Sequence, residues 1–315
     1  MIVIGVDVGG TSIKGAAIRD NGEILDRFQY DMNRDASPED TFGHLAGIIN
    51  SFMIEHHYNE EISGVGLGIP GLIDKEKGTV ASSPNMPKWL NFNIVKFLEE
   101  RIHLPIRIVN DASAAALGEA RFGSGKDYKY LVMITLGTGV GGGIVYNKHL
   151  IDGMESTGAQ LGHQIIEVDG RSCGCGRKGC LEMYASATAI GNDTRIAMEN
   201  NTDTILPEVV KEVGKLNARA AFIAARRGDK VGQELVDNYV KYLGEGLLNI
   251  CNTLRPEIIV LSGGVANEGD YLISKLDKYL ERFDYGMINA PKVIIKQATL
   301  GYDAGKIGAA CLFFE

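Results

Sequence analysis

Residues 2–18 read IVIGVDVGGTSIKGAAI, in which two apolar runs rich in β-branched residues flank a short segment of small residues. Ile2–Val8 and Ile13–Ile18 have the composition of strands, and the glycines between them are typical of a tight turn. Asn21-Gly22 is a strong hairpin signal before a third strand-like stretch, Glu23–Tyr30. The chain is therefore expected to open as a meander of three strands.

The same pattern recurs near the middle of the chain. Tyr130–Leu136 has the composition of a strand, GTGVGGG at residues 137–143 has that of a turn, and Ile144–Tyr146 continues as a second strand. Two copies of one strand-turn-strand unit predict an internally duplicated architecture. A chain of 315 residues also exceeds the size at which a single core usually stops growing, so we expect two domains with a cleft between them.

Apolar spacing and helix-breaking residues predict the remaining elements of the α/β fold. Helices are expected at Pro38–Tyr58, Ile94–Ile102, Ala112–Ala120 and Gly305–Phe314, with mostly helical structure over Ala187–Thr253, and strands at Val65–Ile69, Ile106–Val109, Ile258–Leu261 and Val293–Lys296. The alanine-rich helix after residue 111 places Asp111 at a helix N-terminus.

The charge balance favours a small-molecule ligand. The 40 acidic residues outnumber the 32 basic ones, and the net charge of −8 disfavours nucleic acid and anionic membrane as partners. No apolar run reaches the roughly 18 residues that span a bilayer, and the first residues carry no signal-peptide pattern, so a cytoplasmic protein is expected. Cys251 and Cys311 stand singly in apolar or small-residue contexts and are expected to be buried thiols.

The segment 158–186, GAQLGHQIIEVDGRSCGCGRKGCLEMYAS, combines one histidine with three cysteines. His163, Cys173, Cys175 and Cys180 suffice for a closed tetrahedral Zn²⁺ site, and the glycines between the cysteines let the backbone fold around an ion. The alternative is a set of reduced cysteines in a glycine-rich loop. The clustering of three of the five cysteines beside a histidine favours zinc.

Three strand ends carry glycine turns that are suited to phosphate. The first turn offers backbone amides, a hydroxyl and nearby charged groups from Asp7, Gly9, Gly10, Thr11 and Lys14. The second is Gly137-Thr138-Gly139 and the third is Ser262-Gly263-Gly264; neither the first nor the second has the Walker or dinucleotide-binding arrangement. Each alone is compatible with a plain hairpin turn. Together they favour a nucleoside triphosphate, with Asp7 near its Mg²⁺ through water.

Two carboxylates are candidates for binding or deprotonating a hydroxylated substrate. Asp111 is the candidate base that takes a proton from an attacking hydroxyl, and Asn110 beside it can hydrogen-bond that hydroxyl. The alternative is that Asp111 only caps its helix. Glu182 follows the last cysteine by two residues, so a metal-fixed loop would hold its carboxylate for a polyol; the alternative is a solvated surface residue.

These residues resemble the ROK family of sugar kinases and repressors, within the actin-like ATPase superfold, over the whole chain. The resemblance is carried by the three glycine turns, the Asn110-Asp111 pair and the cysteine segment from its Gly-His through Cys-Leu-Glu. It also includes Gly68-Ile69-Pro70-Gly71, which is similar to a sugar-side loop, and Pro84-Asn85-Met86-Pro87 with Trp89. Ser262-Gly263-Gly264-Val265 resembles the adenosine-side turn.

The resemblance implies two actin-like, ribonuclease H-like α/β domains flanking a cleft, with the zinc-binding loop in the second. Residues 1–112 and 301–315 would form the smaller domain and residues 113–300 the larger. The implied activity is transfer of the γ-phosphate of ATP to the primary hydroxyl of a hexose, with glucose as the expected substrate. His163 and Glu182 would contact the sugar as well as belonging to a structural zinc segment, and Gly71 and Asn85 would line the sugar site. Family members are commonly dimers or tetramers.

One position departs from the family pattern. Glucokinases of the family carry glutamate three residues before the histidine, where this chain has Gln160. An amide donates as well as accepts, so hydrogen bonding near C1 and C2 of the sugar is expected to differ. The alternatives are therefore kinases of N-acetylmannosamine, N-acetylglucosamine or another hexose. A sugar-responsive repressor is disfavoured because no helix-turn-helix precedes the first strand, and an idle sugar-binding module because both phosphate loops are intact.

Overall fold

The computed structural model describes residues 1–33, 35–58, 61–83, 86–285 and 289–314. The chain forms two compact units by its internal contacts. The first contains Met1–Leu131, Gly143–Ala159 and Thr299–Glu315, and the second contains Val132–Gly142 and Gln160–Ala298.

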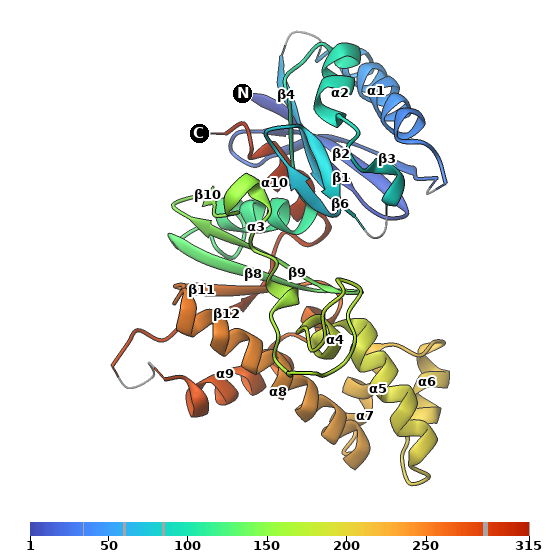
Figure 1. Cartoon of the computed structure of the whole chain (residues 1–315), viewed down its shortest axis with the longest axis vertical. Coiled ribbons are helices and arrows are strands. Elements are labelled where there is room, and N and C mark those ends of the chain that lie inside the picture. The colour runs from blue at the N-terminus through green and yellow to red at the C-terminus, as the bar shows by residue number, and fades with distance from the viewer. Residues whose placement is uncertain (34, 59–60, 84–85, 286–288, 315) are drawn as a thin grey trace. The chain divides into compact units, whose positions relative to one another are not determined.

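The first unit is built on a five-stranded sheet of order β3-β2-β1-β4-β7 (Figure 1). β1 and β2, and β2 and β3, pair antiparallel, whereas β1 pairs parallel with β4 and β4 with β7. The strands are β1 (Ile2–Val8), β2 (Ser12–Arg19), β3 (Ile24–Asp31), β4 (Ile62–Ile69) and β7 (Ile106–Asn110), with a separate pair β5 (Leu72–Asp74) and β6 (Thr79–Ser82). The helices are α1 (Pro38–Glu55), α2 (Ile94–Ile102), α3 (Asp111–Phe122) and α10 (Ala304–Ala310).

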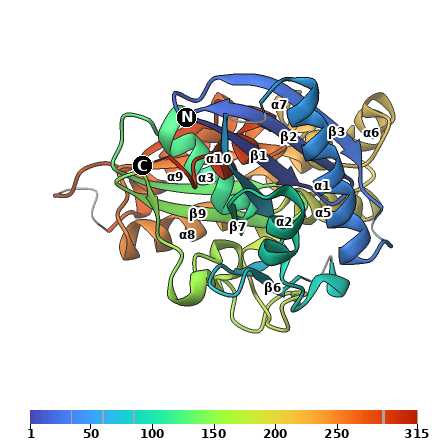
Figure 2. The ribbon, with the colours of Figure 1, turned by 90° about the horizontal axis from the view of Figure 1, so that it is seen from above.

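Large apolar residues and small residues alternate along β1 and β4, so the two faces of this sheet differ. Ile4 and Val6 join the apolar core that includes residues of α1 and α2. Glycines occupy the other face, where a β-carbon on Gly5 or Gly66 would overlap the backbone of α10. Without those β-carbons α10 packs directly on β1 and β4, and Figure 2 shows it beside α3.

The second sheet has the order β10-β9-β8-β11-β12, which repeats the chain order of the first sheet. The predicted internal duplication is therefore confirmed. Its strands are β8 (Tyr130–Leu136), β9 (Val140–Tyr146), β10 (His149–Leu150), β11 (Ile258–Ser262) and β12 (Ile294–Gln297). The helices of the second unit pack against one another: α4 (Glu182–Ala185), α5 (Ala187–Asn200), α6 (Leu206–Val213), α7 (Ala218–Arg226), α8 (Lys230–Thr253) and α9 (Asp270–Phe283) (Figure 1).

The opening meander and the expected helices and strands are confirmed with small shifts at their ends, but one predicted turn was too long. The turn after β8 spans only Gly137–Gly139, and β9 already begins at Val140. Gly142 and Gly143 lie within the strand, where added β-carbons would come 2.6 Å from the Met133 carbonyl oxygen and 2.6 Å from the Ala116 Cβ. These glycines therefore permit close packing rather than a chain reversal.

The contact-based units divide the chain differently from the predicted domains. Residues 113–131 and 143–159 belong to the first unit by contacts, because α3 packs against α10 and β10 against α3. The C-terminal helix does return to the N-terminal unit, as the family topology implies. The division at residue 112 rests on topology rather than contact density and stays a prediction.

Candidate functional site

Asn110 and Asp111 form the junction between β7 and α3. The Asn110 Oδ1 accepts hydrogen bonds from the backbone N–H groups of Ala112 at 3.0 Å and Ser113 at 3.1 Å, so Asn110 is the N-cap. Its Nδ2 donates to the Gly71 carbonyl at 2.9 Å, using one of two amide hydrogens. Asp111 is the first helical residue, and its Oδ1 accepts from Ala112 at 2.9 Å. Because Asn110 already caps the helix, capping does not account for the Asp111 carboxylate.

Burial raises the pKa of the Asp111 carboxyl above its ordinary value. Hydrogen bonds from the backbone N–H of Ala112, from its own N–H and from Asn110 act in the opposite direction, but desolvation is the largest cause. A carboxylate that holds its proton more tightly than a solvated aspartate is a better general base near neutral pH. The sequence hypothesis for Asp111 therefore acquires a physical basis.

Asp7 lies near Asp111 although the two residues are distant in the sequence. Asp7 pairs in register with Gly68 of β4, and a β-carbon on Gly68 would lie only 3.5 Å from the Asp111 Cα. The absent side chain lets α3 start close to the sheet. Burial, and next the charge of Asp111, raise the pKa of Asp7.

Two lysines oppose this effect on Asp7, and sequence reasoning found only one of them. The charges of Lys14 and Lys306 both lower the pKa of Asp7. The Lys14 Nζ also lies 5.4 Å from the centre of the Tyr302 ring. Lys306 is buried in α10 and its Nζ lies 2.7 Å from Asp303. A single charge in the otherwise uncharged segment AGKIGAA was the available sequence signal for Lys306.

The first glycine turn is tight, as predicted. The Gly9 N–H donates to the Ser12 carbonyl at 3.0 Å, and the Met32 N–H donates to the Thr11 carbonyl at 2.9 Å. Asp7, Gly9, Gly10, Thr11 and Lys14 thus lie at the β1–β2 end of the sheet. Gly71 has a φ of 118°, a conformation that favours glycine. Asn85 lies outside the described residues.

In the second unit the four predicted metal ligands come together. The ligand atoms of His163, Cys173, Cys175 and Cys180 all lie within 4.8 Å of one another. The Cys173 Sγ is 3.6 Å from the His163 Nδ1, and the Cys175 and Cys180 Sγ atoms are 3.6 Å apart. Tetrahedral ligands at about 2.3 Å from Zn²⁺ lie roughly 3.8 Å from one another, so the four side chains fit this ion.

Local turns bring the cysteines together. The Gly176 N–H donates to the Cys173 carbonyl at 3.1 Å, and the Cys173 N–H donates to the Arg177 carbonyl at 2.9 Å. Gly176 and Gly179 have φ angles of 89° and 79°, which favour glycine. Burial raises the pKa of the Cys180 thiol to about 12, a cost that a divalent cation among the sulfurs would remove by favouring the thiolate.

Glu182 at the start of α4 connects the cysteine segment to the second glycine turn. Its Oε2 accepts a hydrogen bond from the Val140 N–H at 3.0 Å, and its Oε1 lies 3.8 Å from the Cys173 Sγ. Gly139 allows this approach, because a β-carbon there would overlap the Glu182 carboxylate. The side chain is thus engaged within the fold, and the alternative of a purely solvated surface residue is wrong.

The second and third glycine turns meet in the same unit. The Gly137 N–H donates to the Gly139 carbonyl at 3.0 Å, and the Gly137 carbonyl accepts from Ala187 at 2.8 Å. Gly263 follows β11 with a φ of 88°, and a β-carbon on it would lie 2.6 Å from the Leu136 carbonyl oxygen. Thr138 is exposed at the tip of the second turn.

A cavity of about 380 Å³ adjoins Gly264. α7 and the turn after β11 line this cavity, with Ala218, Arg219, Ile223, Arg226, Gly264, Val265, Asn267 and Glu268. The two arginines of α7 in this lining were not identified from the sequence. Arg226 forms an ion pair with Glu268. Amphipathic spacing in the segment ARAAFIAAR, with arginines on the face away from alanine, was the available signal.

Gln160 precedes the short helical turn Leu161–His163 and is exposed. Its carbonyl accepts a hydrogen bond from the His163 N–H at 3.0 Å. This backbone bond holds Gln160 next to His163, a candidate metal ligand.

Among the described helices, none is long and apolar enough to cross a membrane.

Comparisons with known proteins agree on one family. The model of the ROK family matches residues 3–315. A glucokinase of Halalkalibacterium halodurans is 37% identical over 98% of this chain and 94% of its own length. A crystal structure of a ROK family glucokinase from Streptomyces griseus in complex with glucose and AMPPNP is similar with a TM-score of 0.82, at 31% identity, over 99% of both chains. A xylose repressor of Bacillus spizizenii is 29% identical over 99% of this chain and 77% of its own length.

Proposed function

We propose that this chain, which belongs to the ROK family, is an ATP-dependent sugar kinase that phosphorylates glucose on its primary hydroxyl. The observation that carries the proposal is the partly buried carboxylate of Asp111 at the start of α3, where Asn110 rather than Asp111 caps the helix. Similarity to curated glucokinases and to a glucokinase crystallised with glucose and AMPPNP supports the same reaction.

Asp111 is the proposed catalytic base. The oxygen of the sugar hydroxyl attacks the γ-phosphorus of ATP, its proton passes to the Asp111 carboxylate, and the bond from the γ-phosphorus to the bridging oxygen breaks to release ADP. A pKa above the ordinary aspartate value makes the ionised Asp111 carboxylate a stronger proton acceptor than a solvated aspartate. Asn110 fixes the base by capping the helix and by holding the Gly71 carbonyl.

The glycine turns are the proposed phosphate contacts. The Gly9 and Gly137 N–H groups hold the two turns by donating to the Ser12 and Gly139 carbonyls. Other backbone N–H groups of the turns, such as those of Thr11, Thr138 and Gly139, are proposed to bind the anionic oxygens. The cavity beside Gly264 has the size of a ligand pocket and is proposed to take the adenosine, together with Gly263. Lys14 adds positive charge on the phosphate side. Mg²⁺, when bound with the nucleotide, neutralises phosphate charge, and Asp7 is the proposed protein group on its water shell.

Zinc is the proposed occupant of the four-ligand cluster, and its role is structural. Three sulfurs and one nitrogen complete a tetrahedron, so no position remains for an activated water. The His163 Nδ1 faces Cys173, so with Nδ1 on the metal the proton lies on Nε2, which is the proposed donor to a sugar hydroxyl. Glu182 is the proposed acceptor for a second hydroxyl, and Gly71 and Asn85 are proposed as further sugar-binding residues.

The sugar itself is tested most directly by a coupled ADP-release assay. Purified protein is assayed with glucose, N-acetylglucosamine, N-acetylmannosamine, mannose, fructose and allose under identical ATP and Mg²⁺. The expected result is the highest kcat/KM for glucose. A higher value for an acetamido sugar would identify the alternative that Gln160 raises, and no release with any hexose would contradict a kinase.

A further inference from the structure

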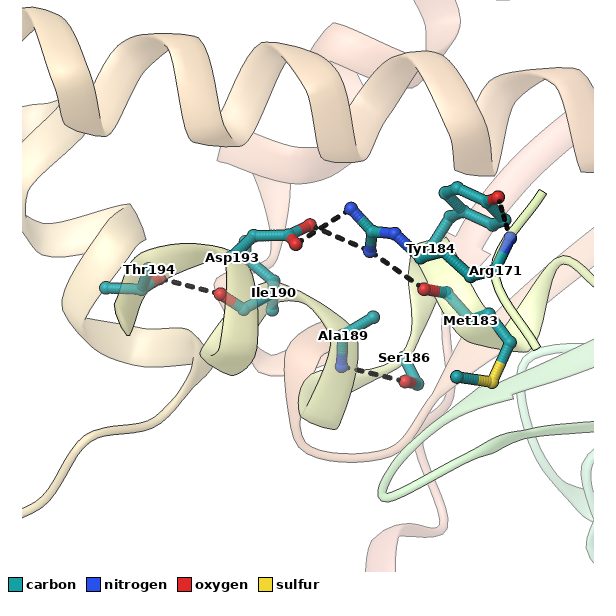
Figure 3. A network of polar contacts seen from close by, with 8 residues as sticks. All are labelled: Arg171, Met183, Tyr184, Ser186, Ala189, Ile190, Asp193 and Thr194. Atoms are coloured by element: carbon teal, nitrogen blue, oxygen red, sulfur yellow. Dashed lines mark hydrogen bonds and ion pairs between the residues drawn. The ribbon is translucent and has the colours of Figure 1, made fainter. Parts of the chain in front are cut away.

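Arg171 joins the cysteine segment to α4 and α5 through several bonds at once (Figure 3). Its guanidinium binds both carboxylate oxygens of Asp193, at 2.8 Å from Nη2 and 3.1 Å from Nη1. The same Nη1 donates to the Met183 carbonyl at 2.9 Å. The Arg171 backbone N–H donates to the Tyr184 hydroxyl at 2.7 Å, and the guanidinium carbon lies 4.6 Å from the centre of that ring.

This arrangement is more specific than an ordinary surface ion pair. The side chains of Arg171 and Asp193 are 41% and 29% exposed, so Coulomb attraction alone contributes little to stability. A two-pronged contact with one carboxylate and a third bond to a carbonyl fix the guanidinium plane in three directions. We therefore expect Arg171 to act by fixing the positions of its neighbours rather than by adding stability through charge.

The element that Arg171 holds carries Glu182 and has little support of its own. α4 contains four residues, and no side chain caps its N-terminus. Such a short helix depends on outside contacts for its orientation. Met183 and Tyr184, the two residues after Glu182, are the ones that Arg171 contacts.

The other partner, Asp193, lies on α5, which begins beside the second glycine turn. The Ser186 hydroxyl caps α5 by accepting from the Ala189 N–H at 3.0 Å (Figure 3). The Ala187 N–H donates to the Gly137 carbonyl at 2.8 Å. One arginine thus links the cysteine segment to α4 and to the helix that contacts the glycine turn.

We propose that Arg171 is a positioning residue that clamps the cysteine segment to α4 and α5, and thereby holds the Glu182 carboxylate for the sugar. The expected effect on sugar binding rests on the proposed function, whereas the expected effect on zinc release does not depend on the kinase activity. The backbone of Arg171 also closes the loop that carries Cys173 and Cys175, because its carbonyl accepts from the Gly179 N–H at 2.8 Å, just before Cys180. Loss of the side chain is expected to loosen both the metal cage and Glu182.

The test compares Arg171→Gln and Arg171→Lys with a matched control, Arg195→Gln. Arg195 also lies on α5, but its guanidinium forms an exposed ion pair with Glu199 of the same helix, at 2.7 Å. Two readouts are measured on the metal-loaded full chain: the rate of zinc release to a coloured chelator, and KM and kcat for glucose.

Arg171→Gln is expected to release zinc about tenfold faster and to raise the KM for glucose about tenfold, with kcat within about twofold. Arg171→Lys restores part of both effects because it keeps one contact with Asp193, and Arg195→Gln changes neither. Mere loss of folded protein would lower kcat without moving KM. Unchanged zinc release and unchanged KM in Arg171→Gln would overturn the proposal. If the wild-type chain phosphorylated no sugar, the proposed function would fail while zinc release still decided the role of Arg171.

Discussion

The Oε2 of Glu182 accepts a hydrogen bond from the backbone N–H of Val140 at 3.0 Å, so one carboxylate bridges the cysteine segment and the second glycine turn. The other oxygen lies 3.8 Å from the Cys173 Sγ. A proposed sugar ligand is thereby attached to a proposed phosphate loop. Disturbing this bond is expected to affect both stability and sugar binding.

Gly139→Ala is the sharpest steric test of this bridge. A β-carbon at Gly139 would overlap the Glu182 carboxylate, whereas a β-carbon at Gly137 would meet no heavy atom within 4 Å. Displacing a charged hydrogen-bond acceptor is expected to lower the free energy of unfolding by about 1–3 kcal/mol in urea denaturation. Gly137→Ala is the control and should stay within about 0.5 kcal/mol. Equal stability of the two variants would show that Glu182 does not need Val140.

Asp111→Asn tests the proposed base. The amide cannot take the proton of the sugar hydroxyl, so kcat is expected to fall by about 10²–10⁴-fold. The Asn oxygen can still accept from Ala112, and Asn110 still caps α3, so glucose binding measured by calorimetry should change little. Activity near the wild-type value would remove Asp111 from this role.

The raised pKa of Asp111 predicts two pH effects of known sign. The base works only when ionised, so kcat/KM is expected to fall as the pH drops through a pKa that lies above the ordinary aspartate value. A raised folded-state pKa means that the stability contribution of this carboxyl is fully present below its unfolded pKa and is lost as pH rises through the folded pKa.

Asp111→Asn should therefore gain stability relative to the wild type as pH rises towards neutrality. Denaturation midpoints measured at several pH values check this. A relative loss of stability over the same range would contradict burial as the dominant influence on the pKa of Asp111.

Metal removal is expected to open the cysteine segment and weaken sugar binding. Cys180→Ser replaces a buried thiolate ligand, so about one zinc per chain should be lost and the KM for glucose should rise. Cys251→Ala is the control, because Cys251 is also buried but lies on α8 outside the cluster. The zinc content and the KM for glucose are measured for both variants. Full zinc content in Cys180→Ser would refute the four-ligand site.

Gln160→Glu tests the position that departs from the glucokinase pattern. The backbone carbonyl of Gln160 accepts from the His163 N–H, so residue 160 is held next to a candidate metal ligand. A glutamate side chain at this position only accepts hydrogen bonds, whereas the glutamine amide also donates. The ratio of kcat/KM for glucose to that for N-acetylmannosamine is expected to change by about tenfold in favour of glucose. An unchanged ratio would remove Gln160 from sugar selection.

The expectation of a dimer or tetramer also stays a prediction, which light scattering of the purified chain would check.

Most of the sheet and helix pattern was predictable, because alternation and helical spacing are local signals. The limits of β8 and α2 match the expected ranges, and the expected meander became β1, β2 and β3. The error at residues 137–143 has a physical cause. Glycine serves turns and close packing equally well, and only the neighbours of Gly142 and Gly143 reveal that they lie in a strand.

The residue types of the candidate site were also predictable, because the chemistry of a thiolate cluster or a carboxylate at a helix start is visible in the sequence. The bonds that tune those residues were not. Lys306 acts on Asp7, and Arg171 binds Asp193, across gaps that no local pattern spans.

The sequence by itself determined the duplicated strand-turn-strand plan and the residue types of the candidate metal ligands and carboxylates, because each depends on nearby residues and on side-chain chemistry. Only the tertiary structure decided that Asn110 rather than Asp111 caps α3, that Glu182 binds Val140, and that glycines let α10 lie on the first sheet. These facts depend on which atoms meet after folding, and that is set by packing between segments far apart in the chain.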